Sequence, residues 1–455
     1  MNIFARIFAV LFTALSLTSC GKDIGTVDAL KTEHFSVSDA MLSYTLYDTY
    51  YYYIDTYGDE GLMAYFGLDT TKSLKKQVYD EKEGTTWFDV FLDLSNDSFK
   101  TALTLCEAAY DNGIELSDID KKFIDYEINQ IKAAAEEGKV DFDKYIVSLY
   151  GKGVKEEDVR KSLEIYRLAN KQYYAIYAEK DATDEEIEKY VSENPGDFKI
   201  RDVKYIKITR SDDSDIEAKI KEYVDKLKAS ATVGDFEKTA DEFLETDYCL
   251  TKTNKILSRT YEYSDTTELY KWIFSGETAT GGTYVSESDG EYTVYIASSD
   301  VYMDTEITRS MYHILFSEDI YDSDENSKIT AENIYKTWQD GDKSVTSFME
   351  LASKYTTDYA SVPVGGYYPN LAKGDLVDEL NEWLFDEERK AGDTDIIKSD
   401  AGYHIVYYAG EGLEKWKMTA FEAVKTEKLQ KEVTSLSEKY EVTVLSENFK
   451  YIKGV

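Results

Sequence analysis

Three observations predict an α+β multidomain protein, in which a C-terminal helix completes a helical N-terminal domain and two tandem α+β domains lie between them. Apolar residues recur at helical spacing over most of residues 38–190. Strand-like alternation begins near residue 199, and the order of elements that follows returns roughly a hundred residues later. A last amphipathic stretch starts at Lys417 and needs an apolar partner, for which the N-terminal helices are the natural choice.

The composition is that of a globular protein, and it excludes one class of partner. The 455 residues include 52 Lys+Arg and 89 Asp+Glu, which gives a formal charge of −37. Binding of nucleic acid by counterion release needs a basic surface, so we expect no nucleic-acid partner. The chain has only 3 His and 3 Cys, so neither a zinc nor a haem centre is expected, and we predict no metal and no cofactor.

The first residues have the pattern of an export signal that ends at a cysteine. Arg6 precedes the apolar run Ile7–Leu17, which is too short to cross a bilayer as a permanent helix. The four residues up to Cys20 resemble the lipobox of bacterial lipoproteins, whose cysteine carries acyl chains in the mature protein. This resemblance predicts a signal peptide at 1–19 and a lipid anchor on Cys20 that holds the chain on the extracytoplasmic face of the cell membrane. The alternative is an ordinary signal peptide with a chance cysteine.

Residues 20–198 are predicted to form the helical domain. Ser38 and Ser117 can cap helices, and Thr183 begins a capping box. The tyrosines at 50–53 are expected to pack between helices, with contact to unfolded chains as the alternative. Turn signals divide the region into six or seven helices, at Gly58, Gly67, Gly84, Gly113, Gly138 and Gly151.

The two α+β domains are predicted at 199–304 and 305–410, followed by the C-terminal helix within 411–455. Matching residues recur at four separated points of the two domains, which makes chance agreement improbable. The points are Tyr205 with His313, Phe236-x3-Ala240 with Phe348-x3-Ala352, Trp272 with Trp383, and Thr293 with His404.

Two of the three histidines lie in strand contexts of the second α+β domain. They stand in Tyr312-His313-Ile314-Leu315 and in Gly402-Tyr403-His404-Ile405, with Tyr355-Thr356-Thr357-Asp358 and Gly365-Gly366 between them. Over about 307–409 this arrangement resembles the parvulin family of peptidyl-prolyl cis/trans isomerases. With the lipobox, the helical region and the C-terminal helix, the whole chain resembles the PrsA-type and SurA-type extracytoplasmic foldases.

The resemblance implies a function, a partner class and a set of site residues. The partners are unfolded or exported polypeptides that contain X–Pro bonds, and the function is that of an isomerase and chaperone for exported proteins. Rotation about the imide needs no nucleophile or metal, since a site that binds the twisted form best accelerates it. The implied catalytic residues are His313, Asp358 and His404, and the implied proline pocket consists of Leu371, Leu376, Leu380 and Phe385.

The chain also departs from the family pattern. After Gly365-Gly366 it continues Tyr-Tyr-Pro, where the family usually has Asp-Leu-Gly. In the first α+β domain the counterparts of the three catalytic residues are Tyr205, Thr246 and Thr293, with Asp247 one residue out of register. We therefore expect the first domain to be inactive and retained for client binding or architecture.

Two alternative functions stay open. One is a holdase chaperone in which both α+β domains are inactive, and the other is a surface lipoprotein that binds a solute or a host partner. The sequence indicates no oligomeric state. For a foldase, the charge of −37 predicts a preference for basic or neutral clients.

Overall fold

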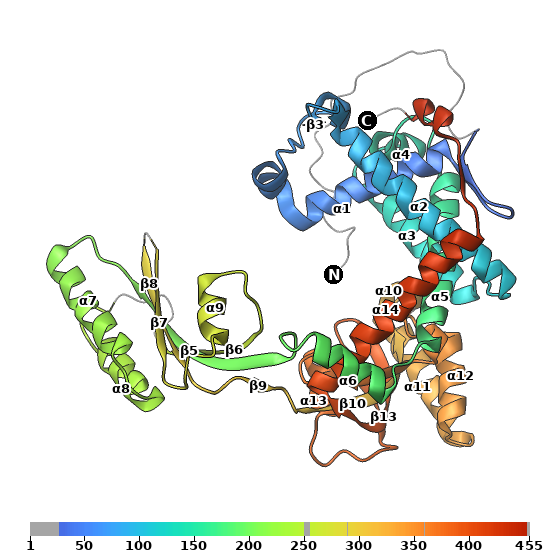
Figure 1. The fold of residues 1–455 in the computed structure, drawn as a ribbon. Helices are drawn as coiled ribbons and strands as arrows, with labels where there is room; N and C mark the ends of the chain where they lie inside the picture. The colour runs from blue at the N-terminus through green and yellow to red at the C-terminus, as the bar shows by residue number, and fades with distance from the viewer. Residues whose placement is uncertain (1–26, 250–254, 289, 359, 453–455) are drawn as a thin grey trace.

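The structure is a computed structural model that describes residues 27–249, 255–288, 290–358 and 360–452. The predicted signal peptide and the lipid-anchor residue Cys20 therefore lie outside the described residues. Within those ranges, no helix is long and apolar enough to cross a bilayer. The architecture mixes helices and sheets, with a helical N-terminal region, as the sequence predicts (Figure 1).

The N-terminal region consists mainly of long helices with side-chain caps. Ser38, Thr86, Ser117 and Thr183 each accept a hydrogen bond from the backbone N–H three residues on, and each belongs to a capping box. The sequence signals at Ser38, Ser117 and Thr183 are thus confirmed. The helices are α1 (Asp39–Phe66), α2 (Trp87–Asp111), α3 (Asp118–Glu137), α4 (Phe142–Tyr150), α5 (Glu156–Glu179) and α6 (Asp184–Glu193).

The predicted turn at Gly58 is a kink inside α1 rather than a boundary between two helices. Gly58 has φ 66° and ψ 167°, which interrupts the helical backbone, and the helix then resumes. Leu62 beyond the kink is fully buried in the same core as the first turns of α1, so packing holds both parts together. The helix ends at Gly67, whose φ of 69° is the left-handed conformation usual at a helix end.

The C-terminal segment returns to the helical domain. Helix α14 (Lys415–Lys439) packs on α2 and α5, with Leu429 fully buried in the core of that domain. Strand β14 (Thr443–Val444) then pairs antiparallel with β1 (Asp28–Lys31). The remaining short elements here are β2 (Ser36–Ser38), η2 (Leu74–Lys76), β3 (Val78–Asp80), β4 (Thr85–Thr86) and η4 (Ser446–Tyr451).

Two α+β units of like topology lie between these segments. The first contains β5 (Lys199–Thr209), α7 (Ser214–Lys228), α8 (Val233–Leu244), β6 (Leu257–Glu262), α9 (Glu268–Phe274), β7 (Thr283–Ser288), β8 (Glu291–Ala297) and β9 (Tyr302–Met303). The second contains β10 (Ile307–Phe316), α10 (Glu318–Tyr321), α11 (Asp324–Asp340), α12 (Val345–Tyr355), η3 (Val362–Val364), β11 (Tyr367–Leu371), α13 (Asp378–Leu384), β12 (Thr394–Ser399) and β13 (Gly402–Glu414). The strand orders β6-β5-β8-β7 and β11-β10-β13-β12 are equivalent when β5 is matched to β10.

Strand register supports the residue pairs that the sequence suggests. Thr293 lies opposite Lys207 on β5, and His404 lies opposite Leu315 on β10. Because Lys207 and Leu315 each lie two residues after the matched positions Tyr205 and His313, the two sheets have the same register at this point. A bend or slip of one residue would have moved these side chains to the opposite face.

An arginine of the first strand, buried at Arg201 and partly exposed at Arg309, links strand and helix in the same way in both units. The Arg201 Nη1 donates to the carbonyl oxygen of Ile273 at 2.8 Å, and the Arg309 Nη1 donates to that of Leu384 at 2.7 Å. Ile273 and Leu384 each directly follow the matched tryptophans of α9 and α13. This contact fixes the short helix against the first strand and places the apolar side chains of α13 beside β10.

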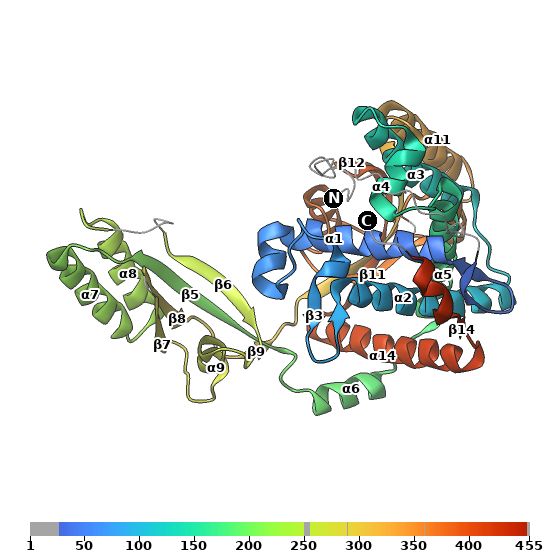
Figure 2. The same cartoon turned by 90° about the horizontal axis from the view of Figure 1, so that it is seen from above.

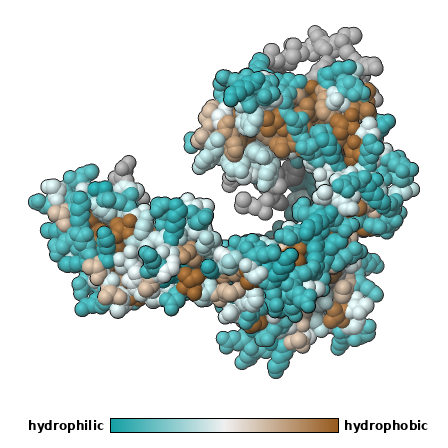
Figure 3. Space-filling view, in the orientation of Figure 1, coloured by the Kyte–Doolittle hydropathy of each residue, from teal (hydrophilic) through white to brown (hydrophobic). Residues whose placement is uncertain are grey.

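The first α+β unit extends away from the rest of the chain, whereas the second lies against the helical domain (Figures 1 and 2). Helix α10 contacts α3, and η3 contacts α5. Helix α14 starts where β13 ends and runs onto the helical domain, so it joins both regions. In the view of Figure 3 most of the surface is hydrophilic, apart from an apolar area on the helical domain around α1 and α2.

Candidate active site

Adjacent strands of the second unit place the two histidines face to face. His313 on β10 and His404 on β13 occupy diagonal positions of one antiparallel pair. Their rings stack with centroids 5.6 Å apart and an interplanar angle of 17°, and their Nδ1 atoms are 3.4 Å apart. Both residues are buried, at 6% and 4% exposure, so their ring nitrogens need partners inside the protein.

Asp358 is brought to His313 by the segment that follows α12. The backbone N–H of Thr357 donates to the Leu315 carbonyl at 2.8 Å, which fixes this segment beside the end of β10. The Asp358 Oδ2 then lies 2.9 Å from the His313 Nε2. The hydroxyl of Tyr368 on β11 donates to the same carboxylate oxygen at 2.7 Å.

The glycine pair is required by close packing against β10. Gly366 has φ 78°, and a Cβ added there would lie 2.3 Å from the carbonyl oxygen of His313 and 2.9 Å from the Ala352 Cβ. The His313 backbone N–H donates to the Gly366 carbonyl at 2.8 Å. Only glycine fits both the backbone angle and the space, so the pair positions His313 itself.

The hydrogen bonds form a chain with one consistent assignment when both rings are neutral. The Asp358 carboxylate accepts from the His313 Nε2, which leaves the His313 Nδ1 to accept from the Nδ1 of His404. The His404 Nε2 accepts from the Ser399 hydroxyl at 2.8 Å, and the Ser399 Oγ accepts from the Ala401 N–H at 3.1 Å. Each of the four ring nitrogens has a partner, which fixes the tautomer of each ring.

The two ends of this chain differ in charge. Burial alone would raise the pKa of Asp358, but the hydrogen bond from His313, the positive charge of that ring when it is protonated, and the hydroxyls of Ser361 and Tyr368 outweigh burial and lower the pKa to about 2. Burial, and after it repulsion from His313 when that ring is protonated, lowers the pKa of His404 to about 3. At neutral pH the site therefore holds a carboxylate at one end and an uncharged imidazole at the other.

An apolar cluster lies directly beside this chain of hydrogen bonds. Leu371 and Leu380 are buried in it, while Leu376 and Phe385 pack against it and stay partly exposed. The structure thus brings the four predicted pocket residues together, with two in the floor and two at the surface. The other buried members are Met311, Trp383, Leu384, Val406 and Tyr408.

Three residues of the site are missing from the sequence prediction. Met311 precedes His313 by two positions on the same strand face, a spacing that could have indicated it. Tyr368 stands in the stretch where the chain departs from the family pattern, and it joins the carboxylate to the apolar cluster. Ser399 carries no signal, because only the β12–β13 hairpin brings it to His404.

The first unit lacks this chemistry at the matched positions. The rings of Tyr205 and Tyr295 lie 5.4 Å apart, and Tyr205 takes the position that His313 has in the second unit. The Thr246 hydroxyl donates to the Phe243 carbonyl, and Asp247 is exposed. The out-of-register aspartate therefore does not replace Asp358.

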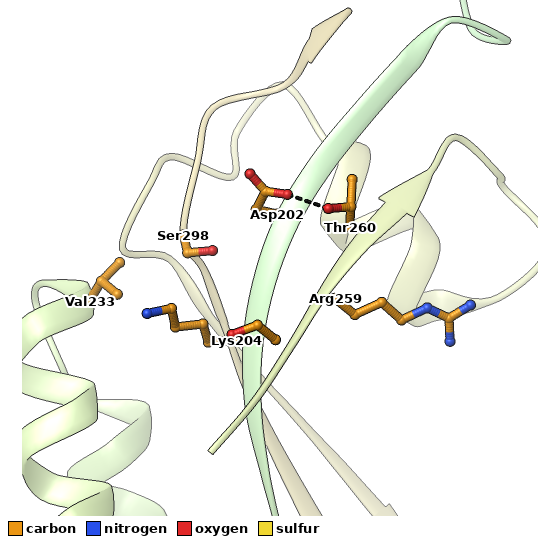
Figure 4. Close-up of a pocket in the computed structure, with 7 residues that line it drawn as sticks. Asp202, Lys204, Val233, Arg259, Thr260 and Ser298 are labelled. Atoms are coloured by element: carbon orange, nitrogen blue, oxygen red, sulfur yellow. Dashed lines mark hydrogen bonds between the residues drawn. The ribbon is translucent and has the colours of Figure 1, made fainter. Parts of the chain in front are cut away.

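A pocket of about 420 Å³ in the first unit lies on the other face of its sheet (Figure 4). Asp202 and Lys204 on β5 point into it, and they alternate with Val203 and Tyr205, so they face away from the position that matches His313. This pocket is polar and is not the counterpart of the histidine site. Its other lining residues are Val233, Ser258, Arg259, Thr260 and Ser298.

Metal binding finds no support in the part of the chain that the structure describes. No group of three or more His, Cys, Asp or Glu side chains there is arranged to hold a metal ion. The two histidine rings are instead satisfied by each other, by Asp358 and by Ser399. Cys106 and Cys249 are both free thiols.

Comparison with known proteins identifies the class of this domain. The family model described as "PPIC-type PPIASE domain" matches residues 302–410, which include the histidine pair, Asp358 and the apolar cluster. These residues form a parvulin-type peptidyl-prolyl isomerase domain. The chain therefore contains a peptidyl-prolyl cis/trans isomerase domain at these residues.

Several solved structures of PrsA proteins are similar to the chain at low identity. The peptidylprolyl isomerase PrsA of Bacillus anthracis is 14% identical, with 63% of this chain and 95% of that chain covered and a TM-score of 0.20. PrsA of Bacillus subtilis is 17% identical, with 82% and 91% covered and a TM-score of 0.24. The foldase protein PrsA of Streptococcus pneumoniae is 16% identical, with 60% and 90% covered and a TM-score of 0.23. No match is found among the curated proteins.

Proposed function

We propose that the protein is a membrane-anchored foldase outside the cytoplasm, which isomerises X–Pro bonds of exported polypeptides and shelters them while they fold. The observation that carries the proposal is the chain of hydrogen bonds through Asp358, His313 and His404 beside an apolar cluster, within a parvulin-type domain. The lipobox at Cys20 supports the anchor and the location.

The site chemistry fits rotation about an imide bond. A planar imide is polarised by resonance, and a twisted one loses that resonance, so an apolar surrounding favours the twisted form. We expect the proline ring to lie on Leu376 and Phe385, the partly exposed members of the cluster. The imide would then lie beside Asp358 and His313, whose fixed hydrogen bonds need no reorganisation during rotation.

The catalytic roles are tested by comparing short-peptide isomerisation with refolding of a proline-limited client. We expect Asp358→Asn and His313→Gln in the full chain to slow both reactions, while Glu350→Gln, an exposed carboxylate on α12, slows neither. An unchanged isomerisation rate in both site variants would refute the assigned roles. A wild-type chain that accelerates neither reaction would refute the foldase proposal as a whole.

The anchor is tested separately in cells. We expect the full chain to fractionate with membranes and to incorporate labelled palmitate, and Cys20→Ala to abolish both. A wild-type chain that incorporates no palmitate would contradict the lipid anchor without affecting the isomerase site.

A holdase without isomerisation is the second candidate, because aromatic side chains are exposed on the helical domain. Tyr52, Tyr65 and Phe66 of α1 are 52%, 78% and 40% exposed. Exposed rings suit loose contact with unfolded chains. Suppression of aggregation of a proline-free client, undiminished in Asp358→Asn, would favour this function over the foldase.

A further inference from the structure

A cavity in the helical domain has no part in the isomerase reaction. Its volume is about 610 Å³, and it lies between α2 and the last two turns of α14, two helices that pack on each other. Thr104 of α2 lines the cavity and is only 2% exposed, so the cavity reaches the interior of the domain. The segment that leads from α14 to β14 closes one side, with Val442 among the lining residues.

Three hydroxyl groups that line the cavity have already given their protons to the backbone. On α2, the Thr101 hydroxyl donates to the carbonyl oxygen of Asp97 at 3.2 Å. On α14, the Thr434 hydroxyl donates to the Gln430 carbonyl at 2.8 Å, and the Ser437 hydroxyl donates to the Thr434 carbonyl at 2.7 Å. A hydroxyl has a single proton, so each of these three oxygens can offer a ligand only its lone pairs.

The phenol and the lysines at the cavity are held by aspartates outside its lining. The Tyr440 hydroxyl donates to the Asp111 carboxylate at 2.5 Å, and the Lys439 Nζ lies 3.2 Å from the same carboxylate oxygen. Lys100, the cation among the lining residues, pairs with Asp97 at 2.9 Å. The positive charges near the cavity are therefore balanced by Asp97 and Asp111.

Two carboxylates of the lining have no such counter-ion. Glu438 and Glu441 are exposed, and in the part of the chain that the structure describes neither forms an ion pair. Together with the three hydroxyl oxygens they give the cavity a wall that mainly accepts hydrogen bonds and carries negative charge. A sugar or another neutral hydroxylated ligand would bring acceptors as well as donors. The arginine and lysine side chains bring several N–H donors, a positive charge and no acceptor, which matches this wall.

We infer that this cavity binds the cationic side chain of an arginine or lysine in an unfolded polypeptide. The inference rests on the proposed foldase function, and it assigns the expected preference for basic clients to one place in the helical domain. A polypeptide is favoured over a free polyamine because Val433 and Val442 also line the cavity and offer apolar surface to a neighbouring side chain. The volume lies within the range of about 300–1,000 Å³ that is usual for ligand sites, which leaves room for part of the backbone beside the basic side chain.

The test is binding of two labelled peptides to the full chain at low ionic strength. Each peptide has a Gly-Ser background and a central residue flanked by one leucine on each side. The central residue is arginine in one peptide and its neutral isostere citrulline in the other. We expect the arginine peptide to bind about fivefold or more tightly, because two carboxylates without counter-ions lie at the cavity and their attraction is weakened by exposure to solvent.

Two double variants with the same change in charge separate the cavity from the general charge of the molecule. Glu438→Gln combined with Glu441→Gln should remove the preference for arginine. Glu427→Gln combined with Glu447→Gln should retain it, because these two carboxylates are exposed in the same C-terminal segment but do not line the cavity. Ser437→Ala removes one acceptor oxygen without changing charge, and it should weaken the arginine peptide by about twofold or more.

Two results would overturn the inference: equal binding of both peptides by the wild type, or a preference for arginine that survives the loss of Glu438 and Glu441. Spermidine is titrated in a separate arm, and its binding to a wild type that does not distinguish the peptides would assign the cavity to a free polyamine instead. The isomerisation rate of each variant is measured in parallel and should be unchanged. A normal isomerisation rate without any arginine preference would reject this site and leave the proposed foldase function standing.

Discussion

Replacement of Asp358 by asparagine should destabilise the isomerase domain by an amount that follows from its pKa. The folded domain holds the pKa of Asp358 at about 2, against an ordinary value of 3.8. At about 1.4 kcal/mol per tenfold change, this difference corresponds to about 2 kcal/mol of stability at pH 7. The side chain is 17% exposed, so screening by solvent removes little of this amount.

The pH dependence has a defined sign. Because the folded-state pKa is lowered, the stabilisation is fully present above pH 4 and is lost as the pH falls toward 2. About half of it should remain at pH 3. Asp358→Asn lacks this contribution at every pH, so the difference between wild type and variant should shrink over that interval.

Hydrogen exchange read by mass spectrometry in the full chain measures this effect locally. Peptides from β10 and β13 should exchange roughly thirtyfold faster in Asp358→Asn at pH 7, after correction for intrinsic rates. Peptides from α2 in the helical domain report on any global change, and Glu350→Gln is the matched carboxylate-to-amide control. Equal exchange in wild type and Asp358→Asn at pH 7, or a difference that does not decrease by pH 3, would refute the reasoning.

One further measurement on the wild type and two further substitutions have defined expected outcomes. The ring resonances of His404 should not titrate between pH 5 and pH 8 in NMR spectra, because burial and His313 lower its pKa to about 3; a midpoint near 6.5 would contradict the assigned environment. Gly366→Ala should cost at least about 2 kcal/mol and displace β10, since its Cβ would meet the His313 carbonyl oxygen at 2.3 Å; exchange in β10 peptides at the wild-type rate would count against this packing. Leu429→Ala in α14 should lower the free energy of unfolding by about 2–5 kcal/mol and expose α2 to limited proteolysis. If α2 stayed protected in this variant, Leu429 would not belong to the core of the helical domain.

The sequence predicts the parts of the site that carry local patterns. The histidine strands and the glycine pair stand in sequence motifs of the parvulin family, so the sequence could predict that His313, His404 and Asp358 share one site. Tyr368 and Ser399 could not, because the β11 register and the β12–β13 hairpin decide where they lie. Helical periodicity shows which face of a helix is apolar, but not what lies opposite that face.

The pairing of two short strands from distant parts of the chain is a feature that the sequence could not show. Strands β1 and β14 have four and two residues, too few for any alternation to be visible, and they are far apart in the chain.

The position of α14 has a consequence for the order in which the molecule forms. The last helix and β14 belong to the same domain as the first strand, so two α+β units are inserted within one helical domain. A chain that emerges N-terminus first presents α2 and α5 long before α14 arrives to cover them. Each α+β unit closes its own sheet from contiguous sequence and can form in the meantime. The isomerase domain can therefore be complete while the helical domain still awaits its final segment, so the molecule can acquire its catalytic part before its overall architecture is finished.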